Sequence, residues 1–262
     1  GGHTIVEVMQ NNVNAVLAQR KKTGVPMFPH INHPNFRWAL TAEELMQLDG
    51  EQFFEVYNGH PTVYNKGDAN RASTDRIWDI ILAERLTVLG KPPMFGMAVD
   101  DSHAYHVGPG RASRPGRGWV MVRAAELTPK ALIAAMEAGD FYASSGVSLK
   151  EVRREKGELT VEIEPQDGVE FTTEFIGTRK GYDRTSQPVA SPDGGELHTT
   201  RKYSDQIGAV LASVKGTKAS YKVKGNEIYV RARVTSSRAH PDPSETGEFE
   251  RAWTQPLVTG VK

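Results

Sequence analysis

The residues of this chain that are best suited to chemistry follow two short apolar runs. The run over residues 94–99 is followed by Asp101 and His103. These two residues are two positions apart, so on an extended backbone their side chains face the same side. A carboxylate and a neutral imidazole are both good ligands for zinc, manganese or iron. The end of this run is therefore a candidate metal site.

A second run of the same kind covers residues 25–32, carries His30, and is followed by His33 and Pro34. Proline has no backbone N–H and stops a strand, so the run ends there. In α/β folds ligands bind where the strands end, because side chains there leave the core. Two strands that each end in metal-binding residue types indicate a metallohydrolase.

Composition narrows the range of functions. The chain has 262 residues, with 32 Lys and Arg against 32 Asp and Glu, so its net charge is zero. This balance argues against nucleic acid as a partner, because polyanion binders gain affinity from neutralising phosphates. We find no membrane segment and no signal peptide. The first residues resemble the middle of a protein, and a cytoplasmic or an exported bacterial location both stay open.

The pattern along the chain changes near residue 148. Residues 1–148 alternate helix and strand patterns, including a capping box at Thr4 and Glu7, and such alternation implies a parallel sheet or barrel. Expected helices cover residues 5–23, 74–89 and 129–139, and expected strands cover 25–32, 52–57 and 94–99. Residues 149–262 instead alternate with period two between turns, which predicts an antiparallel, β-sandwich-like domain.

Four motifs resemble, in order, the later part of the PHP family, the polymerase and histidinol phosphatase metallohydrolases. They are Ile31-Asn32-His33-Pro34, Phe54-Glu55-Val56-Tyr57-Asn58-Gly59, Trp78-Asp79 with Leu82, and Asp101-Ser102-His103. Residues 116–120 and 139–146 resemble the closing region of a bacterial subgroup with a β-rich extension. The resemblance implies an α/β fold: a partial (β/α)7 barrel over residues 1–148, then a smaller antiparallel β-sandwich-like domain over 149–262.

The resemblance also implies an activity. PHP proteins hydrolyse phosphoesters with a metal-bound hydroxide, using up to three divalent ions such as zinc, manganese or iron. His33, Asp101 and His103 match metal ligands of the family, and Asp101 is also the candidate that orients or deprotonates the water. Glu55 and Asn58 match a strand that supports the ligands. A small-molecule phosphoester is the expected substrate.

This chain departs from the family at its beginning. The family opens with a His-x-His motif, and no such motif occurs here. About half of the family's ligands are therefore missing. We expect the first β/α units to have been cut off, or to be supplied by a separate N-terminal fragment that completes the barrel, and this chain alone to hold at most a partial metal site.

Further candidates have an ordinary structural reading beside the functional one. His30 is a second candidate ligand or a core histidine, and His60 is a candidate ligand or a turn residue. Four residues downstream of the Asp-x-His motif are candidates for substrate binding or for a solvated loop: His106, Arg111, Arg114 and Arg117. Arginine suits phosphate because its guanidinium binds two oxygens at once.

Two other functions stay open from the sequence. In one, the chain is a non-catalytic binding or assembly protein that works through exposed aromatics of the β-rich part, such as Tyr182, Tyr203 and Trp253. In the other, it is a metallohydrolase of a non-phosphate ester or an amide. Convergence of His33, Asp101 and His103 within metal distance would favour a hydrolase.

Overall fold

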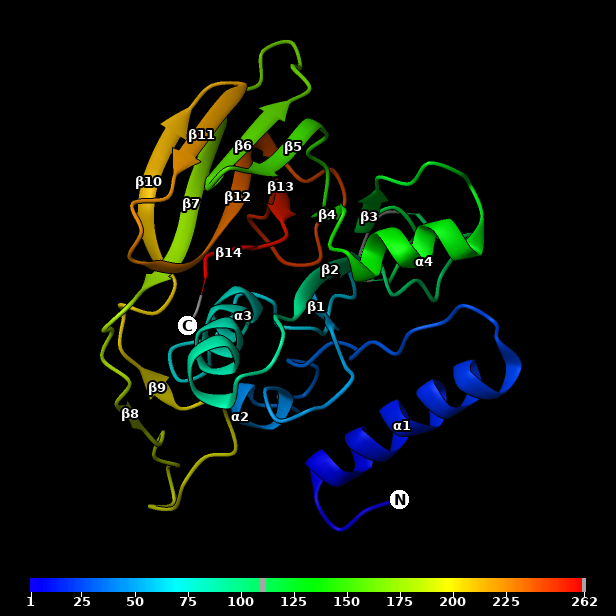
Figure 1. Cartoon of the computed structure of the whole chain (residues 1–262), viewed down its shortest axis with the longest axis vertical. Helices are drawn as coiled ribbons and strands as arrows, with labels where there is room; N and C mark the ends of the chain where they lie inside the picture. Colours follow the sequence, from blue (N-terminus) through cyan, green and yellow to red (C-terminus); the bar gives the residue numbers. More distant parts are fainter. Residues whose placement is uncertain (109–111, 261–262) are drawn as a thin grey trace.

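Antiparallel sheets dominate the architecture, so the predicted α/β barrel is wrong. The computed structural model describes residues 1–108 and 112–260 (Figure 1). Within these residues, strands β1 (Phe53–Asn58) and β2 (Phe95–Val99) pair in the parallel direction. Ile31 adds a single parallel bridge to Phe54 of β1. The β/α alternation of the first half thus produces only a short parallel pair.

The strand expected over residues 25–32 is reduced to that bridge. The Ile31 N–H donates to the Phe53 carbonyl at 2.9 Å, and the Glu55 N–H donates to the Ile31 carbonyl at 3.2 Å. In a parallel strand, the next group on the same edge belongs to the residue two positions earlier, which is Pro29. Proline has no N–H to donate, so pairing does not extend toward the amino end.

The next strands run antiparallel instead of continuing a barrel. Strand β3 (Trp119–Val122) leads through α4 (Pro129–Glu137) to β4 (Phe141–Ser144), and β4 pairs with β3 in the antiparallel direction. A helix between two strands therefore did not indicate a parallel crossover here. Strand β4 also pairs with β13 (Phe249–Thr254), which joins both halves of the sequence in one sheet. The boundary near residue 148 stays a prediction.

Two antiparallel sheets form the upper part of the molecule in Figure 1. The large sheet has the order β10-β7-β12-β13-β4-β3, with β14 (Leu257–Val258) paired to β12. Its remaining strands are β7 (Phe171–Arg179), β10 (Ala209–Lys215) and β12 (Glu227–Ala239). The small sheet has the order β11-β6-β5, formed by Lys218–Lys222, Glu158–Ile163 and Leu149–Glu155. A hairpin of β8 (Ser186–Gln187) and β9 (Lys202–Tyr203) lies apart.

Strand β12 is buried on both faces because each face packs on a different layer. Val230, Ala232 and Val234 belong to a core with Leu159 and Val161 of the small sheet. The alternate residues face helix α3 (Thr74–Glu84), which also packs against β1. Period-two alternation allows one strand to serve two different layers.

The predicted helices form, although α4 ends at Glu137, two residues before its predicted end. Helix α1 (Ile5–Thr23) has the capping box of Thr4 and Glu7, and it ends at Gly24, whose φ is 68°. A short helix, α2 (Ala42–Leu45), is capped by Thr41. Helix α3 continues into a π-helical turn, η1 (Arg85–Leu89), that ends at Gly90.

None of the helices in the described part of the chain is long and apolar enough to cross a membrane.

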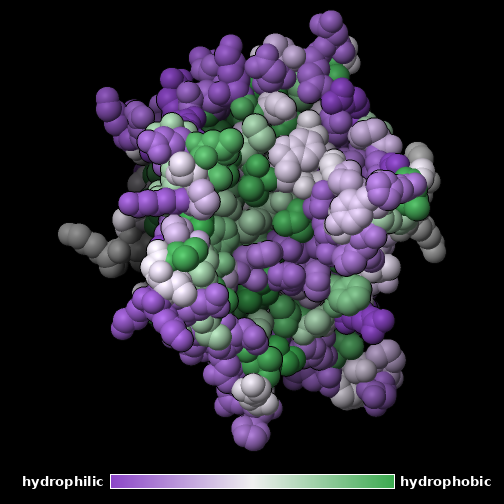
Figure 2. All heavy atoms as spheres, turned by 90° about the vertical axis from the view of Figure 1, so that its right-hand side faces the viewer, coloured by the Kyte–Doolittle hydropathy of each residue, from purple (hydrophilic) through white to green (hydrophobic). Residues whose placement is uncertain are grey.

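One face of the molecule carries grouped apolar side chains. Figure 2 shows the side that lies at the right in Figure 1, where α1, α4 and β3 are found, and apolar residues gather in its middle between polar ones. Leu127, just before α4, is 92% exposed. Grouped exposed apolar side chains suit contact with another polypeptide. The separate N-terminal fragment expected from the sequence stays a prediction.

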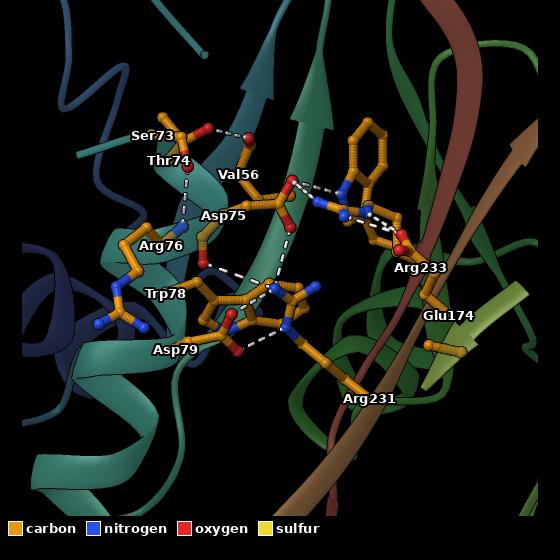
Figure 3. A network of polar contacts seen from close by, with 12 residues as sticks. Val56, Ser73, Thr74, Asp75, Arg76, Trp78, Asp79, Glu174, Arg231 and Arg233 are labelled. Atoms are coloured by element: carbon orange, nitrogen blue, oxygen red, sulfur yellow. Dashed lines mark hydrogen bonds and ion pairs between the residues drawn. The ribbon is translucent and has the colours of Figure 1, made fainter. Parts of the chain in front are cut away.

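Helix α3 is fixed to the large sheet by buried charges (Figure 3). The carboxylate of Asp79 accepts from Arg231 Nε at 2.8 Å and from Arg231 Nη2 at 2.7 Å, and also from the Tyr229 hydroxyl at 2.8 Å. Asp75, one turn earlier, lies 2.9 Å from Arg231 Nη2 and 3.3 Å from Arg233 Nη1. Burial alone would raise the pKa of Asp75, but the two arginines outweigh it and hold that pKa below its ordinary value.

We expect Asp79→Ala to destabilise the chain by about 3 kcal/mol or more, because it leaves the buried Arg231 cation without its main partner. Urea unfolding measures this change. Asp140→Ala is the matched control: its carboxylate is exposed, and its partner Arg154 keeps its hydrogen bond to the Gly139 carbonyl, so the removal should change stability less. Equal effects of the two substitutions would contradict the role given to Asp79.

A second buried carboxyl group predicts pH-dependent stability. Glu51 lies just before β1 and is fully buried. Its Oε1 accepts the Phe53 N–H at 2.6 Å, and its Oε2 has no hydrogen-bond partner among the described residues. Burial raises the pKa of Glu51 from 4.5 to about 7. The folded chain therefore holds a proton that the unfolded chain releases, and it loses stability as the pH rises from about 4.5 to about 7.

Glu51→Gln should remove this pH dependence. We expect the variant to match the unchanged chain near pH 4.5 and to be more stable by up to about 3 kcal/mol above pH 7, since one pKa unit corresponds to about 1.4 kcal/mol. Urea unfolding at both pH values measures the difference. The exposed Glu126→Gln is the control, and a stability gain independent of pH would contradict the assignment.

Candidate functional site

The predicted site residues lie around the carboxyl ends of the parallel segments. His30 and His33 flank the Ile31 bridge, Glu55 and Asn58 belong to β1, and Asp101 follows β2. Because the paired segments run parallel, their carboxyl ends meet at one edge. The sequence spacing therefore brings these residues together, although the expected barrel is absent.

Glu55 is the centre of this edge. Its side chain is almost fully buried, and its Oε1 lies 3.0 Å from His30 Nε2. Its Oε2 accepts the main-chain N–H of His33 at 2.6 Å and Nδ2 of Asn58 at 2.8 Å. Both oxygens are thus bonded within the protein. Glu55 therefore positions the neighbouring segments.

Asn58 connects β1 to both loops of the site. Its Nδ2 also lies 3.3 Å from Asp101 Oδ2, and its Oδ1 accepts the His60 N–H at 2.8 Å. The side chain of Asn65 in turn accepts the Asn58 N–H at 3.0 Å and donates to the Asn58 carbonyl at 2.8 Å. Asn65 was not found from the sequence, because nothing in its local context distinguishes it from a turn residue.

Two of the three predicted ligands have an unusual backbone conformation. The φ angle is 21° at His33 and 48° at Asp101. Positive φ costs a residue with a Cβ about 1–3 kcal/mol and persists only where the surroundings enforce it. The main chain is held there by Glu55, which accepts the His33 N–H, and by Ser113, whose hydroxyl donates to the Asp101 carbonyl. Strain of this kind is concentrated at functional sites.

The imidazole rings form a row. The His33 ring lies 5.1 Å from the Phe36 ring, Phe36 lies 6.4 Å from His60, and His60 lies 5.6 Å from His103, measured between centroids. Burial lowers the pKa of His60, and the nearby His103 and His33 lower it further, although Asp101 opposes them. Burial therefore favours the neutral form of the His60 ring.

The side chains of His33, Asp101 and His103 are of types that bind divalent metals, but their arrangement does not form a complete metal site. Imidazoles and a carboxylate are what zinc, manganese or iron bind. Across residues 1–108 and 112–260, however, no three side chains of His, Asp or Glu are grouped closely enough to hold an ion. His33, Asp101 and His103 thus surround one region without forming a complete coordination sphere. Metal binding and the number of ions stay predictions.

The arginines near the site are engaged within the protein. Arg117 is fully buried; its Nε and Nη2 each donate to Asp242 at 2.9 Å, and its Nη1 donates to the Gly59 carbonyl at 2.9 Å. Arg114 also binds Asp242, at 2.7 Å. These contacts favour a structural role over phosphate binding. His106 is exposed in the same loop, and Arg111 lies outside the described residues.

The aromatics of the β-rich part are not exposed as expected. Trp253 and Tyr182 are 2% and 8% exposed, and both belong to the core around α3. Tyr203 is half-buried against the same core. The expectation of an exposed aromatic binding surface at these residues is wrong, which removes the main support for the binding-module alternative.

Comparison with known proteins adds no family. Neither the models of protein families nor the curated proteins include one that matches this chain. The resemblance to PHP metallohydrolases therefore depends on the four sequence motifs and stays a prediction.

Asn58→Ala should destabilise the chain by about 1–3 kcal/mol, because it removes the hydrogen bonds of a buried amide and leaves the His60 N–H without its acceptor. The lost bonds also include those from Asn58 Nδ2 to Glu55 and Asp101. Urea unfolding measures the loss. The exposed Asn70→Ala is the matched control, and a stability loss no larger than in the control would contradict the connecting role of Asn58.

Proposed function

We propose that this chain carries part of the active site of a metal-dependent hydrolase, with phosphoesters as the substrate class. The observation that supports this proposal is that the segments carrying His33, His60, Asp101 and His103 follow the carboxyl ends of the parallel segments, with the His60 and His103 rings 5.6 Å apart. Backbone strain at His33 and Asp101 supports it further, because the fold maintains an unfavourable conformation there.

His33, Asp101 and His103 are the residues that would hold a divalent cation. His103 Nδ1 lies 2.7 Å from the main-chain carbonyl of Asp101, and metal-binding histidines usually make such a contact with the nitrogen that does not bind the metal. A bound cation would lower the pKa of a water molecule and stabilise negative charge on the substrate.

The chain's own residues have distinct tasks in this proposal. Asp101 orients the attacking water or accepts its proton, and Asn58 holds the Asp101 carboxylate from the side of β1. Glu55 holds the segment of His33 through its N–H and the ring of His30 through Nε2. His30 therefore acts as support and is not among the residues that would hold the cation.

The same site would suit a carboxylic ester or amide, since a metal-activated water attacks either a phosphorus or a carbonyl centre. The substrate class therefore needs a direct comparison. We expect p-nitrophenyl phosphate or its diester to be hydrolysed faster than p-nitrophenyl acetate. The opposite order would replace the phosphoesterase proposal with an esterase.

The test combines metal binding with hydrolysis. We expect the purified chain to bind zinc or manganese in calorimetric titration, and His33→Ala or Asp101→Ala to reduce kcat/KM for p-nitrophenyl phosphate by more than about 100-fold. His3→Ala is the matched control, because His3 is exposed at the start of the chain. Full activity in both site variants, or no metal bound by the unchanged chain, would overturn the proposal.

A further inference from the structure

The two neighbouring imidazoles of the site are held in opposite tautomers. The first is His60, whose Nδ1 lies 3.2 Å from the main-chain N of Thr62 and 2.9 Å from its hydroxyl oxygen. A backbone N–H can only donate, so Nδ1 of His60 must be the acceptor. The proton of the neutral ring is therefore on Nε2.

His103 has the reverse arrangement. Its Nδ1 lies 2.7 Å from the main-chain oxygen of Asp101, and a carbonyl oxygen can only accept. The proton of the neutral His103 ring is therefore on Nδ1. Its Nε2 has a free lone pair, as a metal ligand or a proton acceptor requires.

The surroundings maintain this difference. The His60 N–H donates to Asn58 Oδ1 at 2.8 Å, and Asn65 binds both main-chain groups of Asn58, so the loop that carries His60 and Thr62 is tied to the end of β1. The two rings meet edge to face at 5.6 Å, with 89° between their planes. The site thus presents one N–H donor beside one imidazole lone pair.

We propose that His60 is a hydrogen-bond donor to a negatively charged oxygen of the substrate, beside the free Nε2 lone pair of His103. This inference rests on the proposed hydrolase function and deepens it. To bind a cation through Nε2, His60 would have to move its proton to Nδ1 and lose the hydrogen bond from the Thr62 N–H. His103 needs no such proton transfer, because its Nε2 is already unprotonated and its Nδ1 keeps its hydrogen bond to Asp101.

The donor role fits the chemistry of phosphoester hydrolysis. Negative charge on the phosphoryl oxygens must be stabilised as the transition state forms, and one fixed donor typically contributes about 100-fold to 1,000-fold in kcat. Of the described candidates, Arg114 and Arg117 are both bound to Asp242. The Nε2–H of His60 is a donor at the site that can serve in place of these two.

The first test reads the tautomers directly. Nitrogen-15 NMR of the full chain with labelled histidine, at pH 8, should show His60 protonated on Nε2 and His103 protonated on Nδ1, with His60→Ala and His103→Ala assigning the signals. Added Zn²⁺ should shift Nε2 of His103 and leave the Nε2–H of His60 in place. The opposite tautomers, or direct binding of Zn²⁺ by His60, would overturn the inference.

The second test separates donation from metal binding. We expect His60→Ala to lower kcat for p-nitrophenyl phosphate about 100-fold while Zn²⁺ affinity changes less than about twofold. His60→Gln should recover at least tenfold, because its amide N–H reaches the position of Nε2, whereas His60→Asn reaches only that of Nδ1 and should not. A loss of Zn²⁺ affinity in His60→Ala equal to that in His103→Ala would overturn the inference.

The hydrolase proposal and the donor role of His60 can fail separately, and different results distinguish the two failures. If the unchanged chain binds no Zn²⁺ and hydrolyses no ester, the proposed function fails, and inorganic phosphate becomes the probe. Phosphate should then shift the Nε2–H signal of His60 and bind more weakly to His60→Ala. No shift at saturating phosphate would overturn the donor role as well.

Discussion

The buried guanidinium of Arg231 is the constraint on which the arrangement of the layers depends. An unpaired charge in this position would cost several kcal/mol, so the sheet accepts Arg231 only where Asp79 and Asp75 of α3 are present. The two carboxylates are one helical turn apart and face the same side of α3. The Trp78 ring covers the guanidinium at 4.6 Å. The helix can therefore dock on β12 in one register and one orientation.

The first turn of α3 connects the docked helix to the candidate site through hydrogen bonds. The Thr74 hydroxyl donates to the Val56 carbonyl at 2.5 Å, and the Thr74 N–H donates to the Asn65 carbonyl at 2.9 Å. Strand β1 and the loop that carries His60 are thus both attached to a helix that the sheet holds rigidly. The placement of the site residues thus depends on these polar attachments, together with the ring contacts of His33 and His60 with Phe36.

The sequence predicted local structure well and long-range pairing poorly. The capping box at Thr4 and the apolar runs of β1 and β2 are determined by neighbouring residues, and they form as predicted. The direction of a strand is decided elsewhere: β4 runs antiparallel because it joins β13, more than a hundred residues later. Asp79 was assigned to a family motif, yet its partner Arg231 is 152 residues away. No local pattern indicates such a pair.

In the site too, residues with a local sequence signal were predicted and residues with roles set by long-range contacts were not. Asp101 was found because it follows an apolar run with a clear pattern, whereas Glu55 and Asn58 were found through the match to a family motif. Thr62 and Asn65 were missed because their roles exist only after the loop has folded back on Asn58. Their contribution is nevertheless what sets the tautomer of His60. The identity of a chemical group could be predicted from the sequence, whereas its protonation pattern required the three-dimensional contacts.

The strain at His33 and Asp101 shows how the edge is preorganised. Both residues have positive φ: Glu55 of β1 accepts the His33 N–H, the Ser113 hydroxyl donates to the Asp101 carbonyl, and Asn58 of β1 binds the Asp101 carboxylate. The side chains of Glu55 and Asn58 also bind each other, at 2.8 Å. The positions of the candidate ligands are consequently enforced by the protein alone, before any cation or substrate arrives. A site prepared in this way loses little conformational entropy on binding, which is the advantage that offsets the cost of the strained backbone.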